Sequence, residues 1–115
     1  MKIIDGGITS PLGFKATGIH CGIKKEKPDL ALIYSERPAF AAVAYTQNKM
    51  RAAPIEVMME RDSEMLQAFV VNSGNANAIT GPRGIKDARS MTSVAAKQLN
   101  LKEDLVGVAS TGIIG

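Results

Sequence analysis

Thr111 and Gly112 place two hydrogen-bond donors side by side, a side-chain hydroxyl and a backbone N–H with no bulky side chain over it. They follow an apolar run that predicts a short strand over residues 105–109. Two fixed donors of this kind can stabilise the oxyanion that develops during acyl transfer. The alternative is structural, because Ser110 and Thr111 are also residue types that cap the start of a helix.

A second polar corner covers residues 72–78, which include three asparagines, and it follows an apolar run that predicts a strand over residues 67–72. Asn and Gly supply the positive φ angles that turns need, and buried asparagine side chains need hydrogen-bond partners. The sequence leaves open whether these asparagines form a purely structural network or one that supports a site. Since both polar corners follow strands, we expect a site at strand ends, on loops positioned by a rigid scaffold.

Other residues that carry chemistry give weaker patterns. His20 and Cys21 could pair as base and nucleophile. Adjacent residues of an extended strand point to opposite faces, however, so we expect ordinary packing for both. One His and one Cys cannot supply a Cys/His zinc site, and we expect no metal. Residues 81–86 contain two glycines and a lysine but lack the Gly-Lys-Ser/Thr ending of a phosphate loop.

The composition suits one domain over residues 1–115. Hydrophobic residues make up 45% and charged residues 22%, which favours a packed core over disorder. The net charge of +3 comes from interleaved acids and bases with few aromatics, so we expect no nucleic-acid partner. No apolar run reaches the ~18–20 residues of a membrane span, and the N-terminus lacks the pattern of a secretory signal. The single cysteine is compatible with a reducing compartment, and we expect a cytoplasmic protein.

The hydrophobic pattern predicts a mixed α/β fold in which helices pack on β layers. The clearest element is a helix over residues 81–100, with an apolar stripe that recurs every three or four residues and an Asn at its end. Apolar runs between turn residues predict strands over residues 16–23, 29–35, 40–47, 54–59, 67–72 and 105–109. The second of these is bounded by Pro28 and Pro38, and its short link to the third predicts an antiparallel hairpin. The run 54–59 also suits a helix, and residues 62–65 predict a turn or a single helical turn.

Several longer blocks resemble one protein family, in the same order along the chain. The first blocks are Gly7-Ile-Thr-Ser-Pro-Leu-Gly-Phe-Lys15, Gly18-Ile-His-Cys-Gly-Ile-Lys24 and Asp29-Leu-Ala-Leu-Ile-Tyr-Ser35. The later blocks are Thr46-Gln-Asn48, Ala52-Ala-Pro54, Val71-Asn-Ser-Gly-Asn-Ala-Asn-Ala78 and Ala109-Ser-Thr-Gly-Ile-Ile-Gly115. Together they resemble the ornithine acetyltransferases, also called glutamate N-acetyltransferases, of arginine biosynthesis. The resemblance covers essentially the whole chain.

The resemblance implies a fold, a reaction and a mechanism. It implies the mixed α/β fold of that family and transfer of an acetyl group from N-acetylornithine to glutamate, with no bound cofactor and with acetyl-CoA as a second donor in some members. Family precursors cleave themselves before an internal Thr, which becomes the N-terminal nucleophile of a β chain. Thr111 and Gly112 match the pair that forms the family's oxyanion hole. The residues that bind substrate stay unassigned.

The self-cleaving Thr and its motif are absent from this sequence, so the resemblance implies the N-terminal part of an α chain, inactive alone. The implied partner is a β chain with an N-terminal Thr, in an α2β2 heterotetramer. Two alternatives stay open. The chain could be a non-catalytic structural subunit, or part of a self-processed amidohydrolase or aminopeptidase with a similar layered fold.

Overall fold

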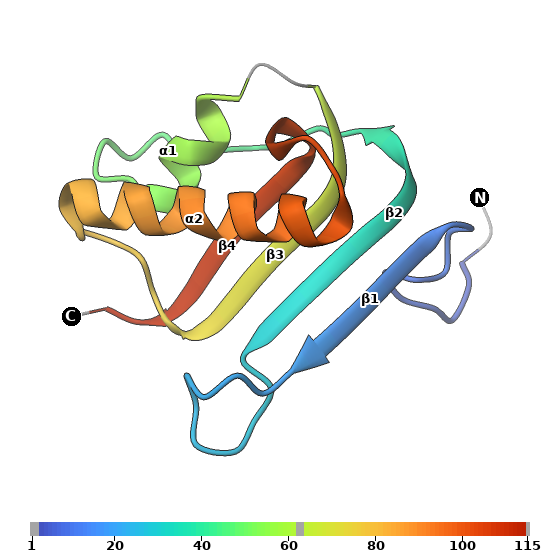
Figure 1. Cartoon of the computed structure of the whole chain (residues 1–115), viewed down its shortest axis with the longest axis horizontal. Helices are drawn as coiled ribbons and strands as arrows, with labels where there is room; N and C mark the ends of the chain where they lie inside the picture. Colours follow the sequence, from blue (N-terminus) through green and yellow to red (C-terminus); the bar gives the residue numbers. More distant parts are fainter. Residues whose placement is uncertain (1–2, 62–63, 115) are drawn as a thin grey trace.

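The computed structural model describes residues 3–61 and 64–114. The chain folds into a four-stranded sheet with two α-helices on one side (Figure 1). The strands lie in the order β1 (Phe14–Ile19), β2 (Leu30–Phe40), β3 (Met65–Asn75) and β4 (Val106–Ile113). β1, β2 and β3 pair antiparallel, whereas β3 and β4 pair parallel. The mixed α/β class expected from the sequence is therefore confirmed.

Helix α2 (Gly81–Leu99) carries the chain from β3 to β4, as a parallel pair of strands requires. A proline occupies the first turn, where its missing N–H has no helical partner to lose. Asn100 ends the helix in the left-handed region at φ 54°. The predicted helix over residues 81–100 is thus confirmed, and Figure 1 shows it lying across the face of β3 and β4.

The core lies between this face of the sheet and the helices. Its fully buried centre is formed by Val106 and Val108 of β4, at 0% and 2% exposure, together with Ala88 of α2 at 0%. Small side chains on α2 let the helix approach the strands closely, so the β-branched residues of the sheet fill the space between them. The remaining members of this buried cluster are Val57, Met58, Ala68, Val70 and Ala96.

Helix α1 (Ala53–Met59) occupies the stretch that we expected as a strand over residues 54–59, so that expectation is wrong. Its buried residues are Ala53, Pro54, Val57 and Met58, which have the three- and four-residue spacing of a helix face. The alternating pattern misled because it assigned Met58 to the polar side. Pro54 in the first turn favours a helix start, since its φ is already helical.

The expected strand over residues 40–47, and its hairpin with residues 29–35, are also wrong. β2 runs past Pro38 to Phe40 and pairs with β1 on one side and β3 on the other. Pro38 is tolerated because the β2–β3 register shifts between Tyr34 and Ala39, where the ladder needs no N–H from the proline. Residues 41–52 have no regular secondary structure.

The bounds of the other strands differ by a few residues from those expected from the sequence. β1 is expected over residues 16–23 but ends at Ile19, because the following residues form a loop. β3 and β4 are both longer than expected and include the polar residues at their C-terminal ends. Residues 62 and 63 of the predicted turn lie outside the described residues. Within the described chain, no helix has the length and apolar character needed to cross a membrane.

Candidate active site at the ends of β3 and β4

The parallel pairing of β3 and β4 brings the two polar corners of the sequence together. Ser73 is the register partner of Thr111, and Gly74 is the register partner of Gly112. Thr111 and Gly112 lie within β4, and residues 72–75 of the second corner lie within β3, whereas residues 76–78 follow in the loop. The two polar segments are therefore adjacent at the strand ends, and a site there, with the catalytic role of Thr111 and Gly112, stays a prediction.

β4 is an edge strand, and within the described residues no other strand pairs with its side away from β3. On this outer edge the Val106 carbonyl accepts a hydrogen bond from the Arg61 guanidinium, and the Val108 N–H lies 3.3 Å from the Met58 sulfur. Backbone groups of a strand alternate between its two edges, so the N–H of Gly112 points to the same outer edge as that of Val108. The Gly112 N–H is thus available to a ligand.

The side chain of Thr111 is exposed, and its hydroxyl has no hydrogen-bond partner among the residues that the structure describes. Alternation along β4 puts Thr111 on the face of the sheet opposite to Val106 and Val108, hence opposite to the helices. The two donors singled out from the sequence are therefore adjacent and exposed, and neither has a partner within residues 3–61 and 64–114.

Gly112 has no room for a side chain. Its φ is 136°, and a Cβ atom would lie 2.4 Å from the carbonyl carbon of Gly74 and 2.5 Å from the nitrogen of Asn75. Gly74 itself has φ 117°. The close approach of these two backbones requires glycine at position 112 and holds its N–H in one place.

The asparagines of the second corner hold the backbone in place. Asn72 is 8% exposed and donates to the Asn75 carbonyl at 2.8 Å, while Asn77 donates to the Gly84 carbonyl of α2 at 2.8 Å. The Thr80 hydroxyl donates to Asn77 at 2.5 Å. These bonds hold the end of β3 and tie the following loop to the start of α2, and whether they also support a site stays open.

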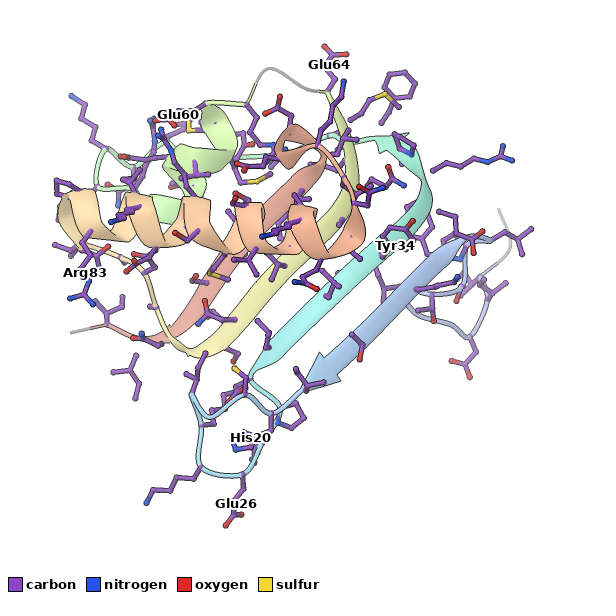
Figure 2. The ribbon with its side chains drawn as sticks, viewed as in Figure 1. His20, Glu26, Tyr34, Glu60, Glu64 and Arg83 are labelled. Atoms are coloured by element: carbon purple, nitrogen blue, oxygen red, sulfur yellow. The ribbon has the colours of Figure 1, made fainter. Side chains whose placement is uncertain are left out.

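A cavity of about 580 Å³ lies next to this corner, on the helix side of the sheet. Its lining includes Asn75, Arg83 and Ser110. Figure 2 shows Arg83 near the start of α2, where it lies 3.7 Å from Asp87 in a highly exposed ion pair. Because Ser110 and Thr111 point to opposite faces, an oxygen bound by Thr111 would not lie in this cavity.

Residues 20–28 form a loop between β1 and β2 that closes around the carboxylate of Asp29, and we call it the Asp29 loop. Asp29 is 2% exposed and accepts hydrogen bonds from the N–H groups of Cys21 at 2.7 Å and Lys24 at 2.8 Å. Burial would raise the pKa of this carboxyl, but the two N–H donors, the Cys21 thiol and His20 together outweigh it and hold the pKa well below its usual range. The structure thus assigns Asp29 an organising role that the sequence reasoning missed.

We expected ordinary packing for His20 and Cys21 rather than a nucleophile–base pair, and the structure agrees with that expectation. The His20 ring nitrogen lies 3.1 Å from the Asp29 carboxylate, and Figure 2 shows His20 in the Asp29 loop. The hydrogen bond to Asp29 raises the pKa of the Cys21 thiol, which makes it a poor nucleophile. Both residues serve the fold of the loop.

Lys24 connects the Asp29 loop to the candidate site. Its ammonium donates to the Ser73 hydroxyl at 2.8 Å, and the Ser73 N–H donates to the Asp29 carbonyl at 2.8 Å. No sequence signal points to this contact, because the two residues are far apart along the chain.

The weak phosphate-loop pattern at residues 81–86 lies within the first turns of α2, so it forms no loop around a ligand. Among the described residues, no cluster of three or more His, Cys, Asp or Glu side chains could hold a metal ion.

Comparison with known proteins assigns this fold and its polar corners to a family. Residues 15–115 match the ArgJ family. The chain belongs to the ArgJ family. Over its whole length it is 50% identical to the arginine biosynthesis bifunctional protein ArgJ of Bacillus licheniformis and 53% identical to that of Streptococcus mutans. It spans 29% and 30% of the lengths of these curated relatives.

Two solved structures share the fold of this ArgJ-family chain. The ArgJ crystal structure from Bacillus halodurans matches with a TM-score of 0.92 and 48% identity, covering 96% of this chain and 59% of that one. The ornithine acetyltransferase of Mycobacterium tuberculosis, complexed with ornithine, matches with a TM-score of 0.87 and 38% identity, covering 95% of this chain and 61% of that one. The family resemblance and the fold inferred from the sequence motifs are both confirmed.

Proposed function

We propose that this chain is part of an acetyltransferase of arginine biosynthesis that moves an acetyl group from N-acetylornithine to glutamate, and that it supplies the oxyanion hole. The observation that carries the proposal is the pair of adjacent, unpaired donors on Thr111 and Gly112, at an exposed strand end. Membership of the ArgJ family and the likeness to an ornithine acetyltransferase support the choice of reaction.

The proposed reaction runs in two half-reactions through an acetyl-enzyme. The hydroxyl oxygen of an N-terminal Thr on a partner β chain attacks the acetyl carbonyl carbon of N-acetylornithine, and its proton passes to that chain's α-amino group. The C–N bond then breaks, and the departing ornithine nitrogen takes the proton. In the second half, the glutamate amine attacks the acetyl ester, the C–O bond breaks, and the Thr oxygen regains a proton.

Thr111 and Gly112 act in both halves. Each attack turns the carbonyl carbon tetrahedral and places a negative charge on its oxygen. The Thr111 hydroxyl and the Gly112 N–H donate to that oxygen, and the fixed position of the Gly112 N–H reduces the reorganisation needed as charge develops. The rigid approach of Gly112 to Gly74 supports this role, since it fixes the N–H before substrate arrives.

The partner chain belongs to the same proposal. In the assembled enzyme, meaning this chain with its β chain in an α2β2 heterotetramer, the nucleophile reaches Thr111 on the outer edge of β4 or on the sheet face opposite the helices. Figure 1 shows α1 and α2 on the other side of the sheet, and Thr111 is exposed among the described residues. We extend the proposal to acetyl-CoA as a second donor and to a cytoplasmic location, in keeping with the relatives' role in biosynthesis.

The test is to trap the acetyl-enzyme. The assembled enzyme is incubated with N-acetylornithine carrying a labelled acetyl group, without glutamate, and analysed by intact-mass and peptide mass spectrometry. We expect one added acetyl group on a second chain that begins with Thr, and its loss to N-acetylglutamate when glutamate is added. Release of free acetate without transfer would support the amidohydrolase alternative. Purification of this chain as a stable monomer, with no second chain, would support the structural-subunit alternative.

A further inference from the structure

Lys24 is held both at its backbone and at the end of its side chain. Its backbone N–H donates to the buried Asp29 carboxylate at 2.8 Å, and its ammonium donates to the Ser73 hydroxyl at 2.8 Å. The loop that carries it is further tied to β3 by the hydrogen bond from the Ser73 N–H to the Asp29 carbonyl, at 2.8 Å. A lysine fixed in this way keeps its charge in one place, at the end of β3.

The stem of Lys24 packs on the backbone beside Gly112. A Cβ atom on Gly74 would lie 2.9 Å from Cγ and 3.4 Å from Cε of Lys24, so the side chain runs directly over Gly74. Gly74 in turn contacts Gly112, its register partner in β4. Packing is therefore continuous from the lysine through Gly74 to the donor at Gly112.

The charge of Lys24 is not neutralised by an acid. No carboxylate lies within ion-pair distance of its ammonium among the described residues, and its side-chain partner is the neutral Ser73 hydroxyl. Ser73 is the register partner of Thr111, and paired strands lie about 5 Å apart. An uncompensated positive charge thus lies one strand away from the proposed oxyanion donors.

We infer that Lys24 is a positioning residue for the oxyanion hole: its stem holds Gly74 against Gly112, and its ammonium favours the negative charge that develops at Thr111 and Gly112. The inference rests on the proposed function. Lys24 makes no contact with substrate in this role. Its electrostatic part acts mainly on the transition state, because the charge exists only there.

The test compares three variants of the assembled enzyme with N-acetylornithine and glutamate as substrates. Lys24→Met keeps a long apolar stem over Gly74 and removes the charge, so we expect kcat to fall about 10-fold while KM changes less than about twofold. Lys24→Arg restores a cation, and we expect kcat within about threefold of the parent enzyme. Lys25→Met is the matched control, since Lys25 is exposed and its side chain forms no hydrogen bond or ion pair within the described chain, and we expect no change.

The outcomes separate this inference from the proposed function. If Thr111→Ala slows the enzyme but Lys24→Met does not, the inference is overturned and the oxyanion hole stands. If Lys24→Met is slow and Lys24→Arg is equally slow, charge is not involved and the electrostatic part of the inference is overturned. Should Lys24→Met fail to fold, Ser73→Ala removes only the ammonium's acceptor, and an unchanged kcat in that variant overturns the inference. If Thr111→Ala itself retains full turnover, the proposed function fails first.

Discussion

Gly74 and Gly112 face one another across β3 and β4, so close that a Cβ on Gly112 would lie 2.4 Å from the carbonyl carbon of Gly74. Side chains in the ordinary range of packing never approach backbone atoms that closely. The two strands can therefore approach this closely only with glycine at position 112. The geometry of the proposed donor at Gly112 is set by this meeting and not by a flexible loop.

Replacing Gly112 by alanine should destabilise the protein strongly. The new Cβ must move the β3 backbone, and alanine at φ 136° is strained as well, so we expect a loss of about 3 kcal/mol. The measurement is the thermal midpoint of the assembled enzyme, which should fall by several degrees. Gly18→Ala is the matched strand control, because its Cβ would meet only the Leu30 carbonyl at 4.0 Å. Equal midpoints for the two variants would contradict the steric argument.

Removal of the Thr111 hydroxyl should slow turnover without unfolding the protein. Thr111→Ala deletes one proposed oxyanion donor, and the usual result is a decrease of kcat by roughly 10²–10³. The side chain is exposed, so the thermal midpoint should stay close to that of the parent enzyme. Thr111→Ser keeps the hydroxyl and should retain most of the rate. A Thr111→Ala enzyme with unchanged steady-state turnover would remove this hydroxyl from the mechanism.

Stability should depend on the ionised state of Asp29 at acid pH. Its pKa in the folded protein is lowered below the unfolded value of about 4, so the anion stabilises the fold above that pH. This contribution is lost as the pH falls below about 4 toward the folded pKa. Asp29→Asn cannot ionise and should be less stable than the parent at neutral pH.

The measurement for Asp29 is the urea midpoint of both proteins between about pH 5 and pH 2. The difference in urea midpoint between the parent and Asp29→Asn should become smaller as the pH falls, because only the parent loses a stabilising anion at position 29. A gap that stays constant over this range would show that the Asp29 loop does not depend on the charge.

Ile79 should be a site where substitution stabilises the protein. It has φ 59° and is 76% exposed, so a β-branched residue occupies the left-handed region with little packing in return. Asparagine tolerates this conformation, and Ile79→Asn should raise the free energy of unfolding by about 1 kcal/mol. Ile79→Val retains the branched Cβ and should give no gain. If the two variants melt at the same temperature, the backbone at position 79 carries no strain.

Local patterns predicted the parts of the fold that depend on nearby residues. Helix α2 has its apolar stripe, its proline start and its Asn100 end within one continuous segment, so its bounds followed from the sequence. The seven residues of α1 are too few for helical and strand patterns to differ clearly, and packing decides between them. Pro38 looked like a strand end because the register shift that accommodates it depends on β3.

Some residues of the candidate site could likewise be predicted from nearby sequence, and others could not. Thr111 and Gly112 stood out because hydroxyl and glycine are adjacent and follow an apolar run. The contribution of Lys24 was invisible, since its partner Ser73 comes from a different strand. Asp29 looked like the first residue of a strand, and only the folded loop shows the N–H groups that gather on its carboxylate.

Because the proposed donors belong to a paired strand, lengthening the turn between α2 and β4 would leave their chemistry intact. Deleting a single residue within β4 would instead turn the Thr111 hydroxyl toward the helices and put a different N–H on the outer edge. Tolerance to insertions and deletions should therefore change abruptly at Val106, and mutational scanning of residues 100–113 would map that change.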